Sequence, residues 1–293
     1  MKKLKQYPAW APAIFVAPFV SATAVFVVYP LIQSIVLASQ QTFGPRRTAF
    51  VGFENFHALM GDPMFWTAVR NTAVFAGGSL LIQMPAALGL AILLSRPDIR
   101  GRAIWRTIFF APSLVGLAFV AVLAALVFEK NTGLLNVFLN AAIGFDREFP
   151  WLQEYVMSSL LIAAAWTSIG FYMVYFLAAL QNVSQDLIEA AMVDGANAWQ
   201  RFWNITIPAI RPVATFVCLL SLIGSFQLFE LPYILLENSA GPDNRGLTVV
   251  MYLYQKGFDQ GDLGYASAIG WFLAITLVLF ACVQVKVSGV SDD

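Results

Sequence analysis

Long stretches of the chain contain no charged residue, and this pattern limits the folds that the chain can adopt. Such stretches cover residues 6–45, 71–95, 107–128, 155–185, 212–229 and 263–285. A helix that crosses a lipid bilayer needs about 20 mainly apolar residues. All but the fifth stretch reach this length, and the fifth reaches it only if its helix continues past Glu230. The sequence therefore predicts an all-α membrane protein with six transmembrane helices, at 9–37, 69–95, 104–128, 155–180, 212–236 and 264–286.

The composition agrees with a chain that is largely surrounded by lipid. Charged residues make up 12% of the sequence and hydrophobic residues 59%, whereas about a quarter of the residues in a soluble domain are charged. The formal net charge of zero provides no basic surface for nucleic acid. Cys218 and Cys282 lie in apolar stretches, and His57 has no cysteine or glutamate at ligand spacing. We therefore expect no disulfide, no metal site and no nucleic-acid partner.

The positions of the basic residues predict which loops lie in the cytoplasm. An even number of spans places both termini on one side of the membrane. The short loop at 96–106 carries Arg96, Arg100, Arg102 and Arg106. Basic residues in short loops close to helix ends mark the cytoplasmic side, so we expect the N and C termini and the 181–212 loop there as well. The first apolar stretch is too long for a cleaved signal sequence, which predicts a retained signal anchor.

The cytoplasmic loop at 181–212 is expected to contain two short helices within a single transmembrane domain that spans residues 1–293. Asp186 and Glu189 have the spacing of an N-cap with a reciprocal carboxylate. Asp194-Gly195 would end this first helix, because glycine accepts the left-handed backbone conformation. The loop therefore has the pattern of a helix, a tight turn and a second helix.

The second helix of the loop is predicted to start at an Asn197–Gln200 capping box and to end at Pro208 and Pro212, before the fifth span. Bulky residues repeat along one face of it, at positions 199, 202, 203 and 205. Such a face suits a helix lying on lipid headgroups or a helix docked into a groove of a cytoplasmic partner. The loop has few basic residues, which does not favour the first alternative.

The loop resembles the coupling loop of permease subunits in binding-protein-dependent ABC importers. The shared pattern is Glu-Ala-Ala-x-x-Asp-Gly-Ala, then five residues, then Phe-x-x-Ile-x-x-Pro. Its members here are Glu189, Ala190, Ala191, Asp194, Gly195, Ala196, Phe202, Ile205 and Pro208. Ile207 stands where that family usually has leucine. The resemblance implies the ABC type I importer permease fold and contact between these residues and an ATPase subunit.

Other segments resemble the carbohydrate branch of the same family. They are residues 50–56, 62–63, 65–66, 71–72, 133–136, 177–181, 241–242 and 264–268. The resemblance implies half of the translocation path of an importer for an oligosaccharide or sugar derivative, similar to the importers of maltose and related oligosaccharides or of glycerol-3-phosphate. The implied location is the cytoplasmic (inner) membrane of a bacterium or archaeon. The implied partners are a second similar permease, two ATPase subunits and an extracytoplasmic solute-binding protein. The sequence has no Gly-x-x-x-x-Gly-Lys loop, so ATP and Mg²⁺ would belong to the ATPase subunits, and we expect no enzyme activity and no cofactor in this chain.

Polar and aromatic residues of the fourth and fifth spans are candidates for the substrate path, because polar groups within a membrane usually face a cavity or another helix. The candidates are Trp166, Gly170, Tyr172, Phe226, Gln227 and Glu230. Gly224 and Pro232 predict an interrupted helix around the last two. Packing between helices is the alternative role for the aromatic residues, and pairing with Arg245 is the alternative for Glu230.

Other membrane proteins fit the sequence less well. A secondary transporter usually shows repeated halves and coupling acids in mid-membrane, and Glu230 is the only acidic residue inside a predicted span. A membrane enzyme would need clustered histidines, cysteines or paired carboxylates. Within ABC importers, a permease for a non-sugar solute such as an amino acid, phosphate or polyamine is the remaining alternative.

Overall fold

The computed structural model describes residues 10–42 and 48–288, and these residues are almost entirely helical. The start of the first predicted span at residue 9 and the chain ends, with the predicted position of the termini, lie outside the described residues. The chain forms two compact units. One contains the described residues up to Asp62 together with Leu253–Phe272, and the other contains Pro63–Tyr252 together with the described residues from Leu273 onward. Whether both belong to one domain in the bilayer stays a prediction.

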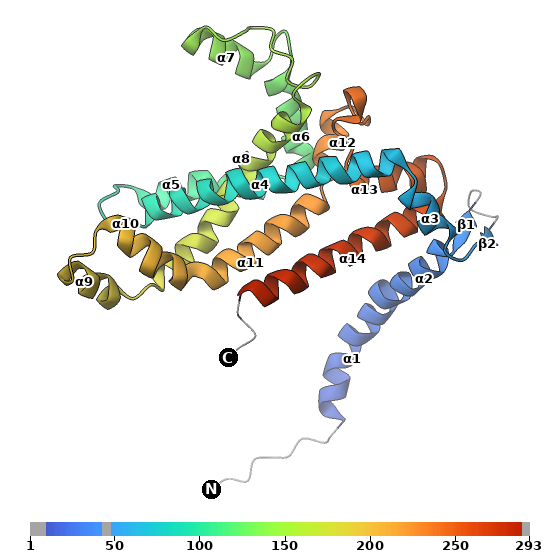
Figure 1. The fold of residues 1–293 in the computed structure, drawn as a ribbon, viewed down its shortest axis with the longest axis horizontal. Coiled ribbons are helices and arrows are strands. Elements are labelled where there is room, and N and C mark those ends of the chain that lie inside the picture. Colours follow the sequence, from blue (N-terminus) through green and yellow to red (C-terminus); the bar gives the residue numbers. More distant parts are fainter. Residues whose placement is uncertain (1–9, 43–47, 289–293) are drawn as a thin grey trace. The chain divides into compact units, whose positions relative to one another are not determined.

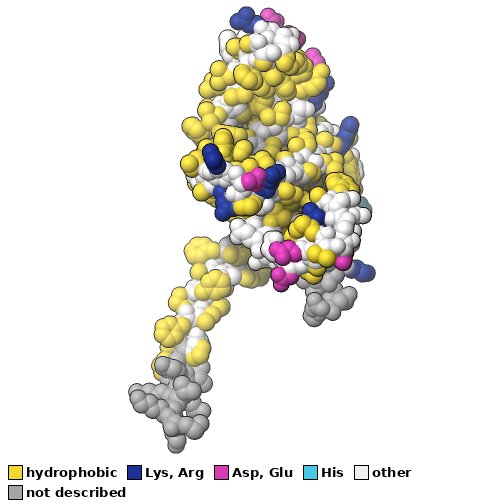
Figure 2. Space-filling model, turned by 90° about the vertical axis from the view of Figure 1, so that its left-hand side faces the viewer, with side chains coloured by type: hydrophobic (Ala, Val, Ile, Leu, Met, Phe, Trp, Pro, Cys, Tyr) yellow, Lys and Arg dark blue, Asp and Glu magenta, His cyan; other side chains and the backbone are white. Residues whose placement is uncertain are grey.

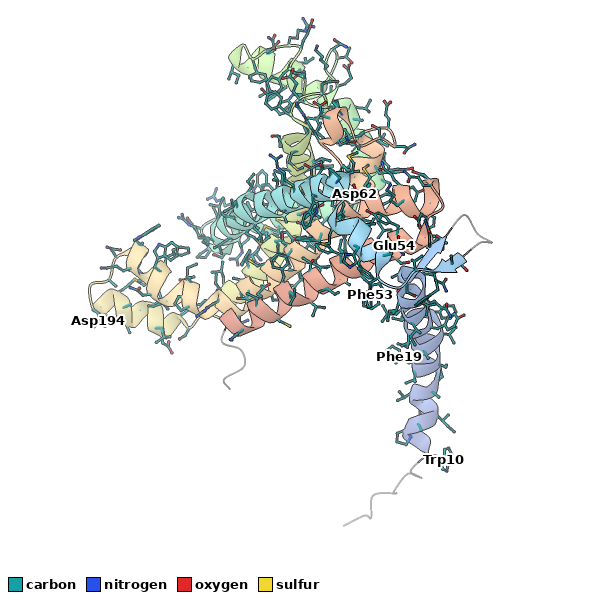
Figure 3. All side chains as sticks on the ribbon, turned by 45° about the vertical axis from the view of Figure 1, so that its right-hand side comes forward. Trp10, Phe19, Phe53, Glu54, Asp62 and Asp194 are labelled. Atoms are coloured by element: carbon teal, nitrogen blue, oxygen red, sulfur yellow. The ribbon has the colours of Figure 1, made fainter. Side chains whose placement is uncertain are left out.

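The smaller unit begins with an apolar helical span of 27 residues, Pro12–Ala38. Its helices and strands are α1 (Ala11–Thr23), the π-helical segment η1 (Ala24–Val28), α2 (Tyr29–Ala38), β1 (Gln40–Thr42), β2 (Thr48–Phe50), α3 (Glu54–Met60) and the π-helical segment η5 (Gln255–Asp259). The two strands pair antiparallel, with Gln40 opposite Phe50. Side chains such as Trp10 and Phe19 project outward along the first span (Figure 3). They are strongly exposed apolar groups, as expected of a helix surrounded by lipid or other helices.

Two contacts inside the smaller unit explain residues that the sequence shares with sugar permeases. The buried amide of Asn55 donates to the carbonyl oxygens of Ala38 and Gln40, both at 2.9 Å. The first bond satisfies the carbonyl of the last residue of α2, which has no partner inside the helix, and the second joins Asn55 to the first residue of β1. A Cβ atom on Gly264 would lie 1.8 Å from the carbonyl oxygen of Gln40, so the close approach of these two backbones requires glycine.

The larger unit contains the remaining helices. They are α4 (Pro63–Ser95), α5 (Arg102–Phe110), the 3-10 turn η2 (Ala111–Leu114), α6 (Leu117–Phe128), α7 (Leu134–Ile143), α8 (Val156–Gln181), α9 (Gln185–Val193), α10 (Ala198–Arg201), the π-helical segment η3 (Phe202–Thr206), α11 (Ile207–Phe226), α12 (Glu230–Leu235), the 3-10 turn η4 (Pro242–Asn244), α13 (Val249–Tyr254) and α14 (Leu263–Ser288). The last two helices each extend across the boundary between the units.

The core of the larger unit is formed by α4, α8 and α11, which pack side by side (Figure 1). Small residues such as Ala87 and Ala91 on α4 are fully buried against Met173 on α8 and Val217 on α11. Alanine at these positions lets the helix axes approach closely, which is how helices associate where lipid replaces water. Hydrophobic side chains cover most of the face shown in Figure 2, and charged side chains form a few small groups there.

The predicted spans are confirmed in number, with differences at three of them, the first being that the second span begins at Pro63 and not at residue 69. Among the described residues, five helices are long and apolar enough to cross a membrane, and six if one bent helix pair counts as a span. The bent pair is the third predicted span, where Arg102–Leu114 and Leu117–Phe128 meet at 99°. The bend follows Pro112, which cannot donate a backbone hydrogen bond, and the chain is extended at Val115 and Gly116.

The fifth span starts and ends earlier than predicted. Its helix is continuous from Ala198 to Phe226, so the prediction that Pro208 and Pro212 end the preceding helix is wrong. Pro208 lies in the first turn of α11, directly after η3. The wider turns of a π-helix redirect the backbone bonds there, and this accommodates a residue without an N–H group.

A buried amide holds the loop between α6 and α8 together. Asn136 is fully buried, and its Nδ2 donates to the carbonyl oxygens of Lys130 (3.0 Å) and Phe149 (3.1 Å). Its Oδ1 accepts a hydrogen bond of 2.7 Å from the indole nitrogen of Trp151. One side chain therefore joins both ends of the segment around α7.

We expect Asn136→Ala to destabilise this loop by about 2–3 kcal/mol, because it leaves the half-buried indole N–H of Trp151 and two carbonyls without partners. Hydrogen exchange of the amides at 145–155 should accelerate about 30-fold or more. Asn140→Ala is the matched control, because its exposed amide makes a single bond to the carbonyl of Phe145. Equal exchange rates in the two variants would contradict this role of Asn136.

Candidate functional site

The α9–α10 loop begins at a different cap from the one predicted. The side chain of Ser184 accepts a bond of 3.4 Å from the backbone N–H of Leu187, which makes Ser184 the N-cap of α9. The predicted Asp186 cap is therefore wrong. Asp186 lies in the first turn of α9 instead, where its negative charge interacts favourably with the helix dipole. Serine is as good a cap as aspartate, so spacing alone did not distinguish the two.

The turn after α9 has the geometry that the sequence predicted. Gly195 adopts a left-handed backbone with φ of 82°. The N–H of Gly195 donates to the carbonyl of Met192 (3.1 Å) and the N–H of Ala196 to that of Ala191 (2.8 Å). This pair of bonds is the Schellman motif, and it satisfies two carbonyls at the end of the helix. Asp194 lies at the tip of the loop (Figure 3).

The predicted capping box at the start of α10 is confirmed. The backbone N–H of Gln200 donates to Oδ1 of Asn197 (2.9 Å), and the backbone N–H of Asn197 donates to Oε1 of Gln200 (2.8 Å). The guanidinium of Arg201 donates to the carbonyl oxygen of Ala196 at 2.8 Å. These bonds fix the second helix against the turn, so the tip is a defined structure rather than a loose connection.

We expect Asn197→Ala to cost about 1 kcal/mol of local stability, because it removes one half of the capping box. Exchange of the amides at 198–202 should then accelerate about fivefold. Asn204→Ala makes the same chemical change on the exposed surface of η3 and should alter exchange by less than about twofold. If Asn197→Ala left exchange at 198–202 unchanged, the cap would not stabilise α10.

The residues of the predicted coupling pattern fall into two groups. Those around the turn are exposed: Glu189, Ala190, Asp194 and Gly195, with Ala191 and Ala196 partly covered; Pro208 is exposed farther along. Phe202 and Ile205 are half-buried, and Ile205 packs against the core formed by α4, α8 and α11. The first group is thus available to a partner, and the second group attaches the loop to the bundle.

Large apolar side chains of the loop are exposed next to the turn. Val193 is 89% exposed and Trp199 is 69% exposed. The rings of Trp199 and Trp203 lie 5.5 Å apart in an edge-to-face arrangement. Exposed aromatic and aliphatic groups that surround a few charged residues are typical of a surface that another protein covers.

The loop between α4 and α5 adds a basic surface. Arg96 pairs with Asp98 at 2.8 Å, and the hydrogen bond from Arg96 lowers the pKa of the Asp98 carboxyl. Arg106 donates to the carbonyl of Leu94 at 2.7 Å. Arg100 and Arg102 are exposed, so they contribute the net positive charge from which the cytoplasmic position was predicted.

The six predicted substrate-path residues do not form one site in this chain. Trp166 is about half exposed, and Phe226 is buried with its ring centroid 5.6 Å from that of Phe280. Gly170 lies where α8 crosses α5, and a Cβ atom there would be 1.7 Å from the carbonyl oxygen of Phe109. Gly170 therefore has a packing role that is visible in the structure. Whether any of the six contacts a sugar stays a prediction.

Tyr172 lines a cavity of about 150 Å³ between α4, α8 and α11, together with polar groups that the sequence prediction omitted. Gln83 donates to the hydroxyl of Ser79 at 3.2 Å, and the buried hydroxyl of Ser221 also lines the cavity. A glutamine within the apolar stretch 71–95 was the sequence signal for this polar group.

The predicted interruption of the fifth span is confirmed, because α11 ends at Phe226 and α12 begins at Glu230. Gln227 and Glu230 are exposed at this break. The alternative that Glu230 pairs with Arg245 is wrong. Arg245 instead pairs with Asp243 at 3.3 Å and donates to the backbone carbonyl of Glu154 at 2.8 Å.

Comparison with known proteins gives the same assignment from several directions. A family profile described as "binding-protein-dependent transport system inner membrane component" matches residues 83–287. The arabinooligosaccharides transport system permease protein AraP of Bacillus subtilis (strain 168) is 38% identical over 95% of this chain and 88% of its own length. The lactose transport system permease protein LacF of Rhizobium radiobacter is 34% identical over 96% of this chain and 95% of its own length.

Comparison with solved structures gives the same assignment. A chain of a bacterial ABC transporter involved in the import of the acidic polysaccharide alginate matches with a TM-score of 0.83 and 26% identity, over 95% of each chain. The bacterial alginate ABC transporter in complex with an alginate pentasaccharide-bound periplasmic protein also matches with a TM-score of 0.83, at 25% identity, over 95% of this chain and 94% of that chain.

Proposed function

The chain belongs to the inner membrane components of binding-protein-dependent transport systems and is a multi-pass, non-catalytic permease of the ABC sugar-importer type, and from this premise we propose how it is coupled to energy. The turn at Asp194-Gly195 binds a cytoplasmic ATPase subunit. ATP hydrolysis by that subunit then drives the helices between outward-facing and inward-facing arrangements.

The observation that carries this proposal is the rigid, exposed tip of the α9–α10 loop. Its carboxylates and apolar side chains are available to a partner, whereas its capping bonds are internal and complete. Because the chain contains no phosphate-binding glycine loop of its own, energy has to reach it through a contact with another protein.

The continuity of the helix from Ala198 to Phe226 supports a direct mechanical link. The second helix of the loop is the start of the fifth span, without an intervening flexible segment. A displacement of the loop by a partner would therefore move α11 as a lever, and α11 packs against α4 and α8. In this mechanism the partner binds one arrangement of the packed helices more tightly than the other. This difference in binding drives the conformational change.

We infer that the cargo is an oligosaccharide, because the relatives transport arabinooligosaccharides and lactose and the structural neighbour imports alginate. The partners would be a second permease, two ATPase subunits that hold ATP and Mg²⁺, and a solute-binding protein like the periplasmic protein bound to the alginate transporter. With the loop in the cytoplasm, the start of α8 lies on the outer side.

Co-expression of the chain with a candidate partner permease, ATPase and binding protein from the same genome tests the proposal. We expect affinity purification in mild detergent to recover a complex that hydrolyses ATP. Proteoliposomes containing the complex should take up sugar only with both ATP and the binding protein. Recovery of the folded chain without any ATPase, under conditions in which the partner permease is retained, would contradict it.

A further inference from the structure

A polar cavity of about 420 Å³ lies at the end of the larger unit that is opposite the α9–α10 loop. The first turns of α4 and α8 and the turn η4 form its walls. Its functional groups belong to Arg70, Asn71, Glu154, Tyr155, Asp243 and Arg245. Because α8 starts at the cavity and leads to α9, the 26 residues of α8 separate the cavity from the loop, a distance of about 39 Å.

Hydrogen bonds across its walls hold the cavity open in a fixed shape. The amide of Asn71 donates to the backbone carbonyls of Asn244 (2.8 Å) and Leu247 (3.0 Å), which fixes the η4 turn to α4. The bond from Arg245 to the carbonyl of Glu154 fixes the same turn to the segment before α8. Asp243 and Asn244 both have positive φ, of 53° and 56°. Aspartate and asparagine adopt this left-handed conformation more readily than other residues apart from glycine, so the sequence of the turn suits its shape.

The groups facing the cavity offer both hydrogen-bond donors and acceptors. Within the part of the chain that the structure describes, neither the guanidinium of Arg70 nor the carboxylate of Glu154 has a hydrogen-bond or ion-pair partner. The two arginines are balanced by the two carboxylates, which provides no net attraction for a charged ligand. A hydroxyl group donates and accepts at once, so a ligand rich in hydroxyls fits this mixture.

The cavity is also lined by an aromatic ring. Tyr155 is 44% exposed, and its ring stacks on that of Phe149 with centroids 4.6 Å apart. This stacking fixes the orientation of the Tyr155 ring, and Tyr155 is one of the residues that line the cavity. An exposed ring beside hydrogen-bonding groups suits a ligand with an apolar face and a polar rim, and a pyranose ring has both.

We propose that this cavity is a binding site for a neutral saccharide at the outer mouth of the permease. There it would receive a sugar unit before the sugar enters the space between the helices. Arg70 and Glu154 would bind its hydroxyls, and Tyr155 would stack on its apolar face. The outward position of the cavity rests on the proposed function, but sugar binding to the cavity can be measured without any partner protein.

Saturation-transfer NMR on the full chain in lipid nanodiscs tests the site, with lactose as the neutral probe and digalacturonate as the acidic probe. We expect a lactose signal from the unmodified chain. The apparent affinity for lactose should fall about tenfold in Arg70→Ala, because a charge-assisted hydrogen bond is lost, and about tenfold in Tyr155→Ala. Tyr155→Phe keeps the ring and should stay within about threefold of the unmodified chain. Arg147→Ala removes an exposed arginine from the same loop region outside this cavity and should change nothing.

Equal lactose signals in Arg70→Ala and Arg147→Ala, or stronger binding of digalacturonate than of lactose, would overturn the site. No lactose signal from the correctly folded chain would overturn it as well. Arg70→Gln, which keeps polarity and length, replaces Arg70→Ala if the latter does not fold. These results are independent of ATPase binding: a chain that binds lactose here but recruits no ATPase refutes the proposed function alone, and the reverse result refutes the site alone.

Discussion

Replacement of Gly195 by aspartate is expected to reduce ATP-dependent sugar uptake at least tenfold while the chain still inserts into the membrane. Gly195 has φ of 82°, a conformation that costs an L-residue about 1–2 kcal/mol. Relief of this strain would break the Schellman bonds and displace Asp194, the residue at the tip. A second carboxylate would also repel Asp194 and alter the charge presented to the ATPase. Hydrolysis by the ATPase would then continue without driving uptake.

The matched control is Gly144→Asp. Gly144 also follows the end of a helix, has φ of 67°, and has no atom within 4 Å of its missing Cβ, as is true of Gly195. The two substitutions therefore introduce similar strain and the same charge at opposite ends of the larger unit. We expect Gly144→Asp to retain most of the uptake. Wild-type uptake by Gly195→Asp, measured in proteoliposomes with equal amounts of protein, would contradict the coupling role.

Gly170→Ala is expected to have the largest effect on stability. The added Cβ would lie 1.7 Å from the carbonyl oxygen and 2.5 Å from the carbonyl carbon of Phe109. Both are backbone atoms of α5, so no side-chain movement relieves the clash, and the crossing of α5 over α8 would have to open. Overpacking of this kind costs about 3 kcal/mol or more, and we expect the yield of folded protein to fall sharply.

Gly89→Ala provides the comparison, because Gly89 is also helical but nothing lies within 4 Å of its missing Cβ. Alanine there should be neutral or stabilising by up to about 1 kcal/mol. Thermal unfolding in detergent, followed by the fraction of monodisperse protein, measures both variants. If Gly170→Ala and Gly89→Ala unfolded at the same temperature, the close crossing of α5 and α8 would not exist in solution.

Most features that depend on local chemistry were predictable from the sequence, with the cap of α9 as the exception, because Ser184 caps it and not Asp186. Charge-free stretches identified the spans, since lipid excludes unpaired charges over the same length in any fold. The turn at Gly195 and the Asn197–Gln200 box were also predictable, because each depends on neighbouring residues alone.

The features that depend on packing were not predictable. Pro208 normally marks a helix boundary, yet the π-helical segment before it lets the helix continue. The bend after Pro112 was hidden inside an uninterrupted apolar stretch. The substrate-path candidates were chosen for their chemistry, and the structure places Gly170 against backbone and Phe226 against Phe280. Only the three-dimensional fold determines which groups meet across helices.

A photo-crosslinking amino acid at Val193 tests the central proposal most directly, because this exposed side chain is adjacent to Asp194. Phe138 on α7, which is 68% exposed in the region expected to be extracytoplasmic, is the control position. In cells that express the whole importer, we predict a covalent adduct between position 193 and the ATPase subunit and none from position 138. Absence of the ATPase adduct at position 193 in an assembled importer, or equal adducts at both positions, would contradict the proposal that this loop receives the energy of ATP hydrolysis.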